Sequence, residues 1–411
     1  MSETPKLRVL SIAHAAVSRP AGRLRYHPFA ARNDLDVHLV VPARWHQFGR
    51  TMRADPPGDP GVTVHVLPIW FPRAGPMSWY LHVYPGLGRL IREIEPDVVH
   101  LWEEPWSLVS LQASLLKGRA ALVMEVDQNI LKRLPPPFEA IRRHVLRQTN
   151  FVLSRSPDAT DVVRARGYRG PVGPIGYGVD QQNFWPRTEE PVRPIGTLRV
   201  GYVGRVIEEK GLDDVIEAIA RAQSRVSLAV MGEGPHESAL HQHAQSLGIE
   251  DRLSFQPWGP PNDVADFIRG LDILVLLTRR TKNVLEQFGR VIVEAQSCGI
   301  PVIGSSTGAI PNVVGEGGWI VPERDPTSLA RLFDNLAAAP RDVRMKGQLA
   351  QQNVTTRFTY QTIAAQLAQA WIEAAQSQQS IILRNEHQRS LGERVRSIVG
   401  PMHRPGPTKT K

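Results

Sequence analysis

The sequence has little cysteine and no long apolar run. Cys298 is the single cysteine among 411 residues, so neither an intrachain disulfide nor a cysteine-based metal cluster can form. The longest apolar run lies within Leu271 to Leu277, far below the roughly 18 residues that a membrane-spanning helix needs. The N-terminal residues show no signal-peptide pattern. These absences exclude disulfide-framework and membrane-spanning proteins, and they predict a cytoplasmic location.

Charge is distributed unevenly along the chain, whose formal net charge is +9. Residues 1–180 carry 23 Lys and Arg against 16 Asp and Glu, and residues 384–411 carry 7 against 2, whereas residues 181–383 carry 19 against 22. Two basic regions favour an anionic partner, such as a phosphate-bearing substrate or anionic lipid. A soluble protein of high pI without such a partner is the alternative. Zinc-finger, RNP-type and helix-turn-helix patterns are missing, so no nucleic-acid partner is expected.

Short apolar, β-rich runs alternate with helical stretches, a pattern typical of parallel strands joined by crossover helices. The first series of runs covers residues 7–13, 37–41, 62–69, 98–101, 121–126, 151–154 and 172–175. The pattern then restarts with residues 198–204, 226–232, 253–255, 273–277, 302–305 and 319–321. The predicted fold class is α/β, with two doubly wound, Rossmann-like domains that face a cleft at the carboxyl ends of both sheets.

The expected domain boundaries follow from composition. Residues 1–183 form the first domain, a proline-rich and charged stretch at 184–197 is the linker, and residues 198–357 form the second domain. A C-terminal helix is expected over 358–383, with Ile363, Leu367 and Trp371 on one stripe that can pack on a domain surface. The basic tail, residues 384–411, is expected to be disordered.

The most informative segment is EQFGRVIVEAQSCGIPV, which starts at Glu286. A helix that begins near Gly289 would leave the amides of Phe288, Gly289 and Arg290 facing the cleft as donors, and a phosphate or a sugar hydroxyl could bind there. Glu294, about one turn into the helix, would point a carboxylate to the same cleft and could bind a ribose diol. The alternative is that Glu286 caps the helix and Glu294 is a solvated helix residue.

A second group of residues lies at the end of the restart strand. Gly204, Arg205 and Lys210 belong to the segment GYVGRVIEEKG, near the place where a diphosphate would lie in such a fold. Gly232 and Gly234 follow the next strand, where the backbone is expected to approach a ligand closely. Together with the helix start, these residues predict a phosphate-binding site in the second domain.

These motifs, followed by CGIPVIGSSTGAIPNVV, resemble the second domain of family 4 glycosyltransferases. The segment IGYGVDQQNFWP, residues 175–186, is similar to the segment with which that family closes its first domain. The resemblance covers about residues 170–375. It implies the GT-B fold and the transfer of a sugar from a nucleotide donor with retention of anomeric configuration. Polysaccharide or glycoconjugate biosynthesis is the expected setting, with a glycan, a lipid-linked or a small-molecule acceptor.

The resemblance also implies roles for single residues. Arg205 and Lys210 would bind the donor diphosphate, Glu294 the ribose hydroxyls, and Glu286 with the neighbouring amides the transferred sugar. Fixed cations and a helix N-terminus stabilise the leaving diphosphate more in the transition state than in the ground state, so no metal and no other cofactor is expected. The string Asp34-Leu35-Asp36 precedes a strand and is interpreted as a turn rather than a metal site.

The first domain departs from the family pattern. Its loop after the first strand carries Arg19, Arg23 and Arg25 in place of a glycine pair, and these arginines could hold an anionic acceptor, approach the donor phosphates or form a solvated basic loop. Polar residues at strand ends are candidates for binding acceptor hydroxyls, although such residues also cap helices or satisfy structural needs. The candidates are His14, Glu103, Glu104, Glu125 and Asp127, with Asp127 the first choice for a catalytic role.

Aromatic and basic residues together suggest a surface that meets anionic lipid at the cytoplasmic face of a membrane. They are Trp70, Trp79 and Tyr80 near Arg73, and Arg142, Arg143 and Arg147 on a helix that begins at Phe138. Core aromatics beside a solvated helix face are the alternative. Two other functions stay open: a catalytically silent sugar-nucleotide-binding protein, and a GT-B epimerase or phosphorylase, neither of which is expected to show this combination of motifs.

Overall fold

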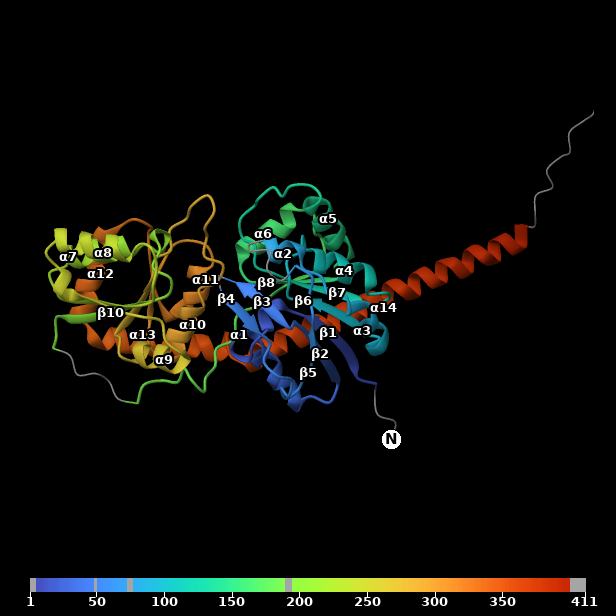
Figure 1. The fold of residues 1–411 in the computed structure, drawn as a ribbon, viewed down its shortest axis with the longest axis horizontal. Coiled ribbons are helices and arrows are strands. Elements are labelled where there is room, and N and C mark those ends of the chain that lie inside the picture. Colours follow the sequence, from blue (N-terminus) through green and yellow to red (C-terminus); the bar gives the residue numbers. More distant parts are fainter. Residues whose placement is uncertain (1–4, 48–49, 72–76, 189–193, 400–411) are drawn as a thin grey trace, which may run out of the picture.

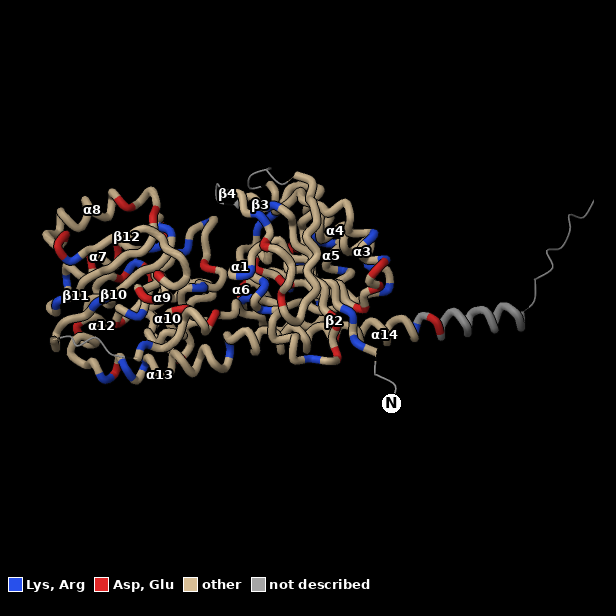
Figure 2. The backbone as a smooth tube through the Cα atoms, turned by 60° about the horizontal axis from the view of Figure 1, so that its bottom comes forward, with Lys and Arg blue, Asp and Glu red and all other residues tan. Residues whose placement is uncertain are grey.

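The computed structural model describes residues 5–47, 50–71, 77–188 and 194–399. Two α/β domains lie next to each other, and the C-terminal helix runs from the second domain along the first and projects beyond it (Figure 1). Lys and Arg are interspersed with Asp and Glu along the backbone of both domains (Figure 2). No helix in the described ranges has the length and apolar character that crossing a bilayer requires.

The first domain is built on a seven-stranded parallel sheet with the order β5-β2-β1-β6-β7-β8-β9. Most strand residues are apolar, and two buried clusters of apolar side chains pack against the sheet. The strands are β1 (Leu7–Ile12), β2 (Leu35–Pro42), β5 (Thr63–Leu67), β6 (Val98–Leu101), β7 (Ala121–Val126), β8 (Phe151–Ser154) and β9 (Val172–Pro174), beside an antiparallel pair, β3 (Arg44–Gln47) and β4 (Arg50–Arg53).

The helices of this domain follow the strands as crossovers. They are α1 (Arg19–Gly22), α2 (Ser78–Leu81), α3 (Leu87–Ile94), α4 (Leu108–Leu116), α5 (Phe138–Gln148) and α6 (Pro157–Ala165), with 3-10 segments at His14–Ala16 and Arg23–Ala31. Asp34 pairs with Arg32, and Asp36 is the second residue of β2, at the amino end of the sheet. The Asp-Leu-Asp string therefore lies on the edge that faces away from the strands' carboxyl ends.

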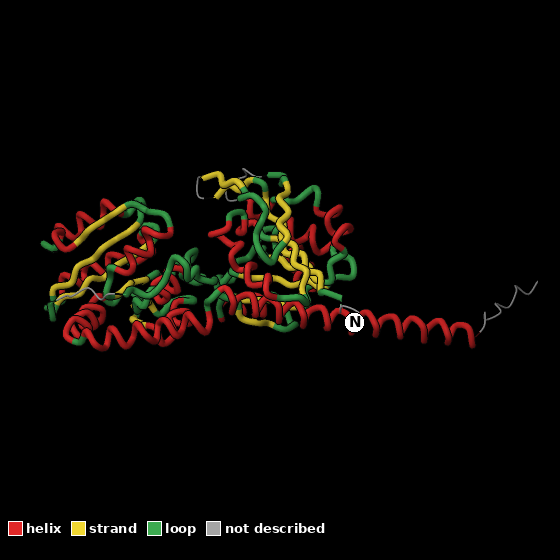
Figure 3. Tube along the Cα trace, turned by 90° about the horizontal axis from the view of Figure 1, so that it is seen from below, coloured by secondary structure: helices red, strands yellow, loops and turns green. Residues whose placement is uncertain are grey.

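The second domain repeats the plan with a six-stranded parallel sheet, whose order is β12-β11-β10-β13-β14-β15. Figure 3 shows its strands between layers of helices. The strands are β10 (Thr197–Val203), β11 (Arg225–Met231), β12 (Leu253–Gln256), β13 (Ile273–Leu276), β14 (Val302–Ser305) and β15 (Gly318–Val321). The helices are α7 (Leu212–Arg221), α8 (Glu237–Ser246), α9 (Pro261–Arg269), α10 (Arg290–Ser297), α11 (Ile310–Val314), α12 (Pro326–Ala338) and α13 (Pro340–Arg357), with 3-10 segments at Glu208–Lys210, Glu250–Arg252 and Gly315–Gly317.

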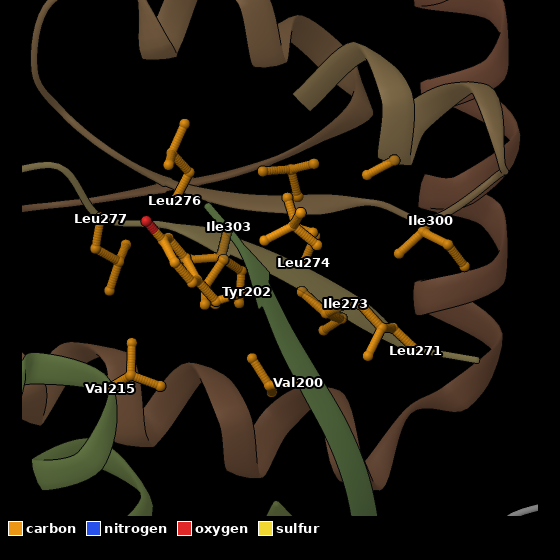
Figure 4. Packing of buried hydrophobic residues seen from close by; sticks show 14 of the residues in the cluster. Val200, Tyr202, Val215, Leu271, Ile273, Leu274, Leu276, Leu277, Ile300 and Ile303 are labelled. Atoms are coloured by element: carbon orange, nitrogen blue, oxygen red, sulfur yellow. The ribbon is translucent and has the colours of Figure 1, made fainter. Parts of the chain in front are cut away.

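The core of the second domain is packed around its central strands. Val200 and Tyr202 of β10 lie beside Leu271 and Ile273 (Figure 4), and all four are buried. Gly201 lies so close to Leu271 that an added Cβ would come within 2.2 Å of that side chain. Replacing Leu271 by alanine would therefore leave a cavity that costs about 2 to 5 kcal/mol of stability.

The C-terminal helix α14 (Tyr360–Val399) returns to the first domain. The predicted stripe is confirmed, because Ile363, Leu367 and Trp371 are completely buried in a cluster with first-domain residues. The predicted end of the helix at residue 383 was wrong, as was disorder over 384–399, since the helix continues to Val399. Residues 376–399 contain a single glycine and no proline, so nothing in them breaks a helix. Residues 400–411 of the predicted tail lie outside the described residues.

Candidate active site

The loops that follow β10 and β11 pack against each other at the carboxyl edge of the second sheet. Gly204 and Gly232 have φ of +150° and +148°. A Cβ on Gly232 would lie 1.9 Å from the Gly204 oxygen, and one on Gly234 would lie 2.0 Å from the Val206 oxygen. Contact between the two loops therefore already requires glycine at positions 232 and 234. The expectation that a ligand also approaches the backbone there stays a prediction.

Lys210 and Glu286 meet in this edge, although the sequence suggested separate roles for them. The Lys210 Nζ lies 2.6 Å from the Glu286 Oε2, and the side chains are 17% and 15% exposed. Thr278 lies between them, donating to Glu286 Oε2 at 2.8 Å with its hydroxyl 3.3 Å from Lys210 Nζ. Glu286 therefore fixes the position of the Lys210 ammonium group. An anionic ligand would have to displace the Glu286 carboxylate or bind Lys210 together with it.

Helix α10 begins beside this cluster. Gly289 is its N-cap with φ of +81°, and no side chain caps the helix, which excludes the alternative that Glu286 does so. The Ile292 amide donates a backbone hydrogen bond to the Gly289 carbonyl oxygen at 2.9 Å, in the first turn of the helix. The amides before Ile292 thus lie at the positive end of the helix dipole without partners in the preceding turn. The Phe288 ring is buried against Tyr177, so only the backbone of Phe288 is available to a ligand.

Glu294 lies one turn into α10 and lines a cavity of about 150 Å³ with Arg290. The cavity is also lined by Trp258 and Gly259 from the loop after β12 and by Asn183 from the segment between the domains. Burial raises the pKa of the Glu294 carboxyl, and Arg290 partly offsets this rise. Glu294 is therefore not a solvated helix residue, and a small polar ligand could reach it.

Arg205 follows β10 and is exposed, whereas the Tyr202 hydroxyl of the same strand donates to the Arg205 oxygen at 2.8 Å. The structure thus gathers Arg205, Lys210, Glu286 and the start of α10 at one sheet edge. The sequence pattern did not single out Thr278. It is recognisable only as the first polar residue after the apolar run of β13.

The corresponding strand ends of the first domain are occupied by buried ion pairs. Glu125 is 1% exposed, accepts from Arg25 at 2.5 and 3.1 Å, and also pairs with Arg155. His100, which is completely buried, lies 3.1 Å from the same carboxylate. Although burial opposes ionisation, Arg25 and Arg155 hold the pKa of Glu125 well below its usual range. Glu125 is therefore removed from the acceptor-side candidates, because its oxygens are already bonded inside the domain.

Asp127 is still partly accessible, but it has a partner. Its carboxylate accepts from Arg155 Nε at 2.7 Å, and its side chain is 24% exposed. Glu104 accepts from the amides of Asp127 and Gln128 at 3.0 and 2.9 Å. Burial, helped by the Asp127 charge, raises the pKa of Glu104 to about 8. Glu104 thus shapes the turn that carries Asp127, while Asp127 keeps a surface toward solvent.

The arginines after β1 do not form a solvated loop, and neither Arg23 nor Arg25 is available to a substrate. Arg23 is completely buried, and it donates to the carbonyl oxygens of Ala16 and Val17 and to Asp59. Arg19 donates to Asp59 as well, at 3.2 Å. These contacts correct the expectation of an anion-binding or solvated loop, since internal acceptors take up the donors.

The Asn129 side chain joins the first domain to the loop that carries Glu286, where its Nδ2 donates to two backbone carbonyl oxygens. Asn129, two residues beyond Asp127, donates from Nδ2 to the backbone carbonyl oxygen of Glu286 at 2.9 Å and is 6% exposed. The same oxygen accepts from the Ala309 amide at 3.0 Å. The sequence pattern did not single out Asn129, because nothing local shows that its partner lies 157 positions away.

Two consecutive domains, each built on a parallel sheet, are the arrangement of the GT-B fold. Solved structures support this assignment at the level of the fold. Sucrose-phosphate synthase from Thermosynechococcus elongatus matches with a TM-score of 0.67 and 19% identity over 90% of this chain and 99% of that chain. Anabaena HepE, solved in complex with UDP and glucose, matches with a TM-score of 0.62 and 19% identity over 88% and 98%.

Family models match both halves of the sequence. Residues 29–183 match "Glycosyltransferase Family 4", and residues 188–352 match "Glycosyl transferases group 1". The chain belongs to the family 4 glycosyltransferases, a family of enzymes with the GT-B fold.

Similar proteins of known function are found among bacterial glycosyltransferases. A D-inositol 3-phosphate glycosyltransferase of Streptomyces bingchenggensis is 32% identical over 188 residues, 42% of this chain and 40% of that protein. A 2-deoxystreptamine N-acetyl-D-glucosaminyltransferase of Streptomyces fradiae is 32% identical over 282 residues, 62% of this chain and 66% of that protein. The matched region spans less than half of the first of these relatives.

Proposed function

We propose that this chain transfers a sugar from a nucleoside diphosphate donor to a hydroxyl group of an acceptor, with retention of anomeric configuration. The observation that carries the proposal is the cluster of Lys210, Thr278 and Glu286 at the start of α10, with Glu294 in the adjoining cavity. Cation, carboxylate, helix amides and a second carboxylate are the groups that a diphosphate, a sugar and a ribose diol require.

In the proposed reaction the bond between the anomeric carbon and the donor phosphate oxygen breaks, and its electron pair stays on the diphosphate. The acceptor oxygen then bonds to the anomeric carbon on the same face, and its proton passes to the leaving phosphate. Lys210, Arg205 and the first amides of α10 stabilise the charge that grows on the diphosphate. Glu294 holds the ribose, and Glu286 orients both Lys210 and the transferred sugar.

These side-chain cations are proposed to neutralise the donor diphosphate without a metal ion at that site. Turnover is then expected to persist when magnesium and manganese are left out of the assay. UDP-sugars are the first donors to test, because structurally similar HepE is described with UDP and with UDP-glucose.

The proposed acceptor is a glycan or lipid-linked hydroxyl presented at an anionic membrane. Trp70, Phe71, Met77 and Trp79 are 61%, 55%, 42% and 40% exposed, in two segments that flank residues 72–76, which include Arg73 and lie outside the described residues. Large apolar side chains near basic ones suit the interface of an anionic bilayer.

Helix α5 adds part of the expected basic surface. Arg143 and Arg147 are exposed, whereas Arg142 is buried and pairs with Glu139, so the expectation that all three face lipid was wrong. Tyr80 of α2 contacts α5, because its ring lies 5.1 Å from that of Phe138 at the start of α5. Co-sedimentation with vesicles rich in anionic lipid tests this surface, and we expect binding at low salt that Trp79→Ser and Arg143→Ser each weaken. Absence of binding at low salt would remove the membrane from the proposal.

The transfer itself is tested by incubating the full chain with UDP-, GDP- and ADP-sugars and following release of the free sugar and the nucleoside diphosphate. We expect slow hydrolysis of one donor class even without an acceptor, and Lys210→Ala should lower its rate roughly 100-fold. Binding of a donor without any hydrolysis would favour a silent sugar-nucleotide-binding protein. Conversion of the sugar without release of diphosphate would favour an epimerase.

A further inference from the structure

Two histidines flank a buried glutamate at the carboxyl edge of the first sheet. Glu103, which follows β6, is 4% exposed. His14 follows β1, and its Nδ1 lies 2.6 Å from the Glu103 Oε2. His82 follows α2, and its Nε2 lies 3.7 Å from the Glu103 Oε1. Three separate segments thus bring two imidazoles to one carboxylate.

The hydrogen bonding of His82 defines which of its nitrogens faces Glu103. His82 Nδ1 donates to the Ser78 oxygen at 2.8 Å, because a carbonyl oxygen can only accept. In the neutral ring, Nε2 then carries a lone pair. This atom is buried and has no hydrogen-bond partner in the described part of the chain. A lone pair that faces a carboxylate oxygen without water is unfavourable unless a positive charge lies between them.

Two more buried polar atoms near His82 lack partners among the described residues: the Tyr84 hydroxyl and the Trp45 Nε1. Their rings lie 5.9 and 5.0 Å from that of His82. Buried polar groups in native proteins are nearly always satisfied, by protein, by water or by an ion. Water can satisfy the indole N–H and the tyrosine hydroxyl, whereas the lone pair of His82 Nε2 beside the Glu103 carboxylate requires a positively charged partner.

The donor set matches a particular class of ion. The three ligand atoms all lie within 4.8 Å of one another. Two imidazoles and one carboxylate are ligands that zinc prefers, and a water molecule usually completes such a set. The hydrogen bond of His82 also suits a metal ligand, because a metal-bound histidine commonly donates its other ring N–H to a backbone carbonyl, as His82 does to Ser78. His14 is 20% exposed, which leaves a side open to water.

We propose that His14, His82 and Glu103 form a metal site that binds one divalent cation of the zinc type. The ion would tie the segment after α2 to the ends of β1 and β6, in the domain opposite the donor cluster. The inference is independent of sugar transfer, since it concerns only these ligands, and binding of the metal is the readout.

The test uses full chain without a histidine tag, freed of metal and titrated with zinc against a chromophoric chelator. We expect one tightly bound zinc per chain. His82→Gln and Glu103→Gln should each weaken zinc binding on the order of 100-fold, and His14→Asn at least about tenfold. His65→Asn is the matched control, because His65 pairs with His38 at 3.0 Å without a shared buried carboxylate, and it should change the affinity less than about twofold.

A second measurement needs no variant. Cobalt(II) added to the metal-free wild-type chain should show the intense visible absorption of a four-coordinate site, and one equivalent of zinc should remove it. Less than one equivalent of zinc bound at micromolar free metal would overturn the proposal and leave the cluster as a buried carboxylate beside two histidines. Unchanged zinc affinity in a folded His82→Gln protein would overturn it equally.

Discussion

Residues that follow strands of the first sheet line a pocket together with Arg290 at the start of α10, yet the carboxyl ends of the two sheets differ in how their charges are used. In the first domain, Glu125, Arg25 and Arg155 satisfy one another in a buried network. In the second domain, glycine turns, one partly exposed ion pair and a helix N-terminus leave groups that a ligand can reach. Charged residues at strand ends can thus either stabilise a domain through buried ion pairs or remain available to a ligand, depending on the partners that the fold brings to them.

The largest expected effect lies in the buried network of the first domain. Glu125→Ala leaves Arg25 and Arg155 without their common carboxylate, and breaking such a buried pair costs about 3 to 5 kcal/mol of unfolding free energy. Urea denaturation measures the change. Glu93→Ala, which breaks the exposed pair with Arg89, should cost less than about 1 kcal/mol. Equal losses of unfolding free energy in the two variants would show that the buried network does not stabilise the domain.

The second effect concerns the open edge of the second domain. Lys210→Ala should lower turnover roughly 100-fold while donor affinity changes less, because the cation faces charge that develops as the diphosphate leaves. Steady-state kinetics with a working donor measures both quantities. Lys346→Ala on α13 serves as a control, and the double variant with Arg205→Ala should lose less than the product of the single losses. A pure rise in the donor KM would contradict the role of Lys210 in the transition state.

Glu294 allows a smaller and cleaner comparison. Glu294→Gln keeps the shape of the side chain but removes its charge, and hydrogen bonds to a ribose diol should weaken by on the order of 1 to 3 kcal/mol. Calorimetry with a nucleoside diphosphate measures the loss, with Glu373→Gln on α14 as the control. An unchanged affinity would assign Glu294 to the packing of α10.

The smallest effect is a pH dependence in the turn below Asp127. The pKa of Glu104 is raised from 4.5 to about 8, so the folded state holds a proton that the unfolded state releases. Stability contributed by this carboxyl is therefore present below pH 4.5 and is lost as the pH rises toward 8. Glu104→Gln should raise the melting temperature by a few degrees more at pH 8 than at pH 5. Equal shifts at both pH values would remove this assignment.

Much of the fold was predictable because parallel strands buried on both faces are nearly continuous apolar runs, and every predicted run from residues 7–13 to 319–321 overlaps an observed strand. The donor-side residues were predictable because a glycine turn, a basic residue and a helix start lie close together in the sequence. The availability of the acceptor-side candidates was not predictable, since Glu125 and Asp127 are both acidic residues at the end of the same strand. Their difference arises from Arg25, which lies 100 positions before Glu125.

Local periodicity and glycine at particular turns can be read from the residues alone. They predict two α/β halves, the helix that starts after Gly289 and the polar groups beside it. The tertiary structure sets the partners of these groups: Lys210 pairs with Glu286, Asn129 donates a hydrogen bond to the Glu286 carbonyl, and His14 and His82 lie beside Glu103. The physical reason is that the energy of a charge depends on its burial and on partners far away along the chain, and neither is written in the residues next to it.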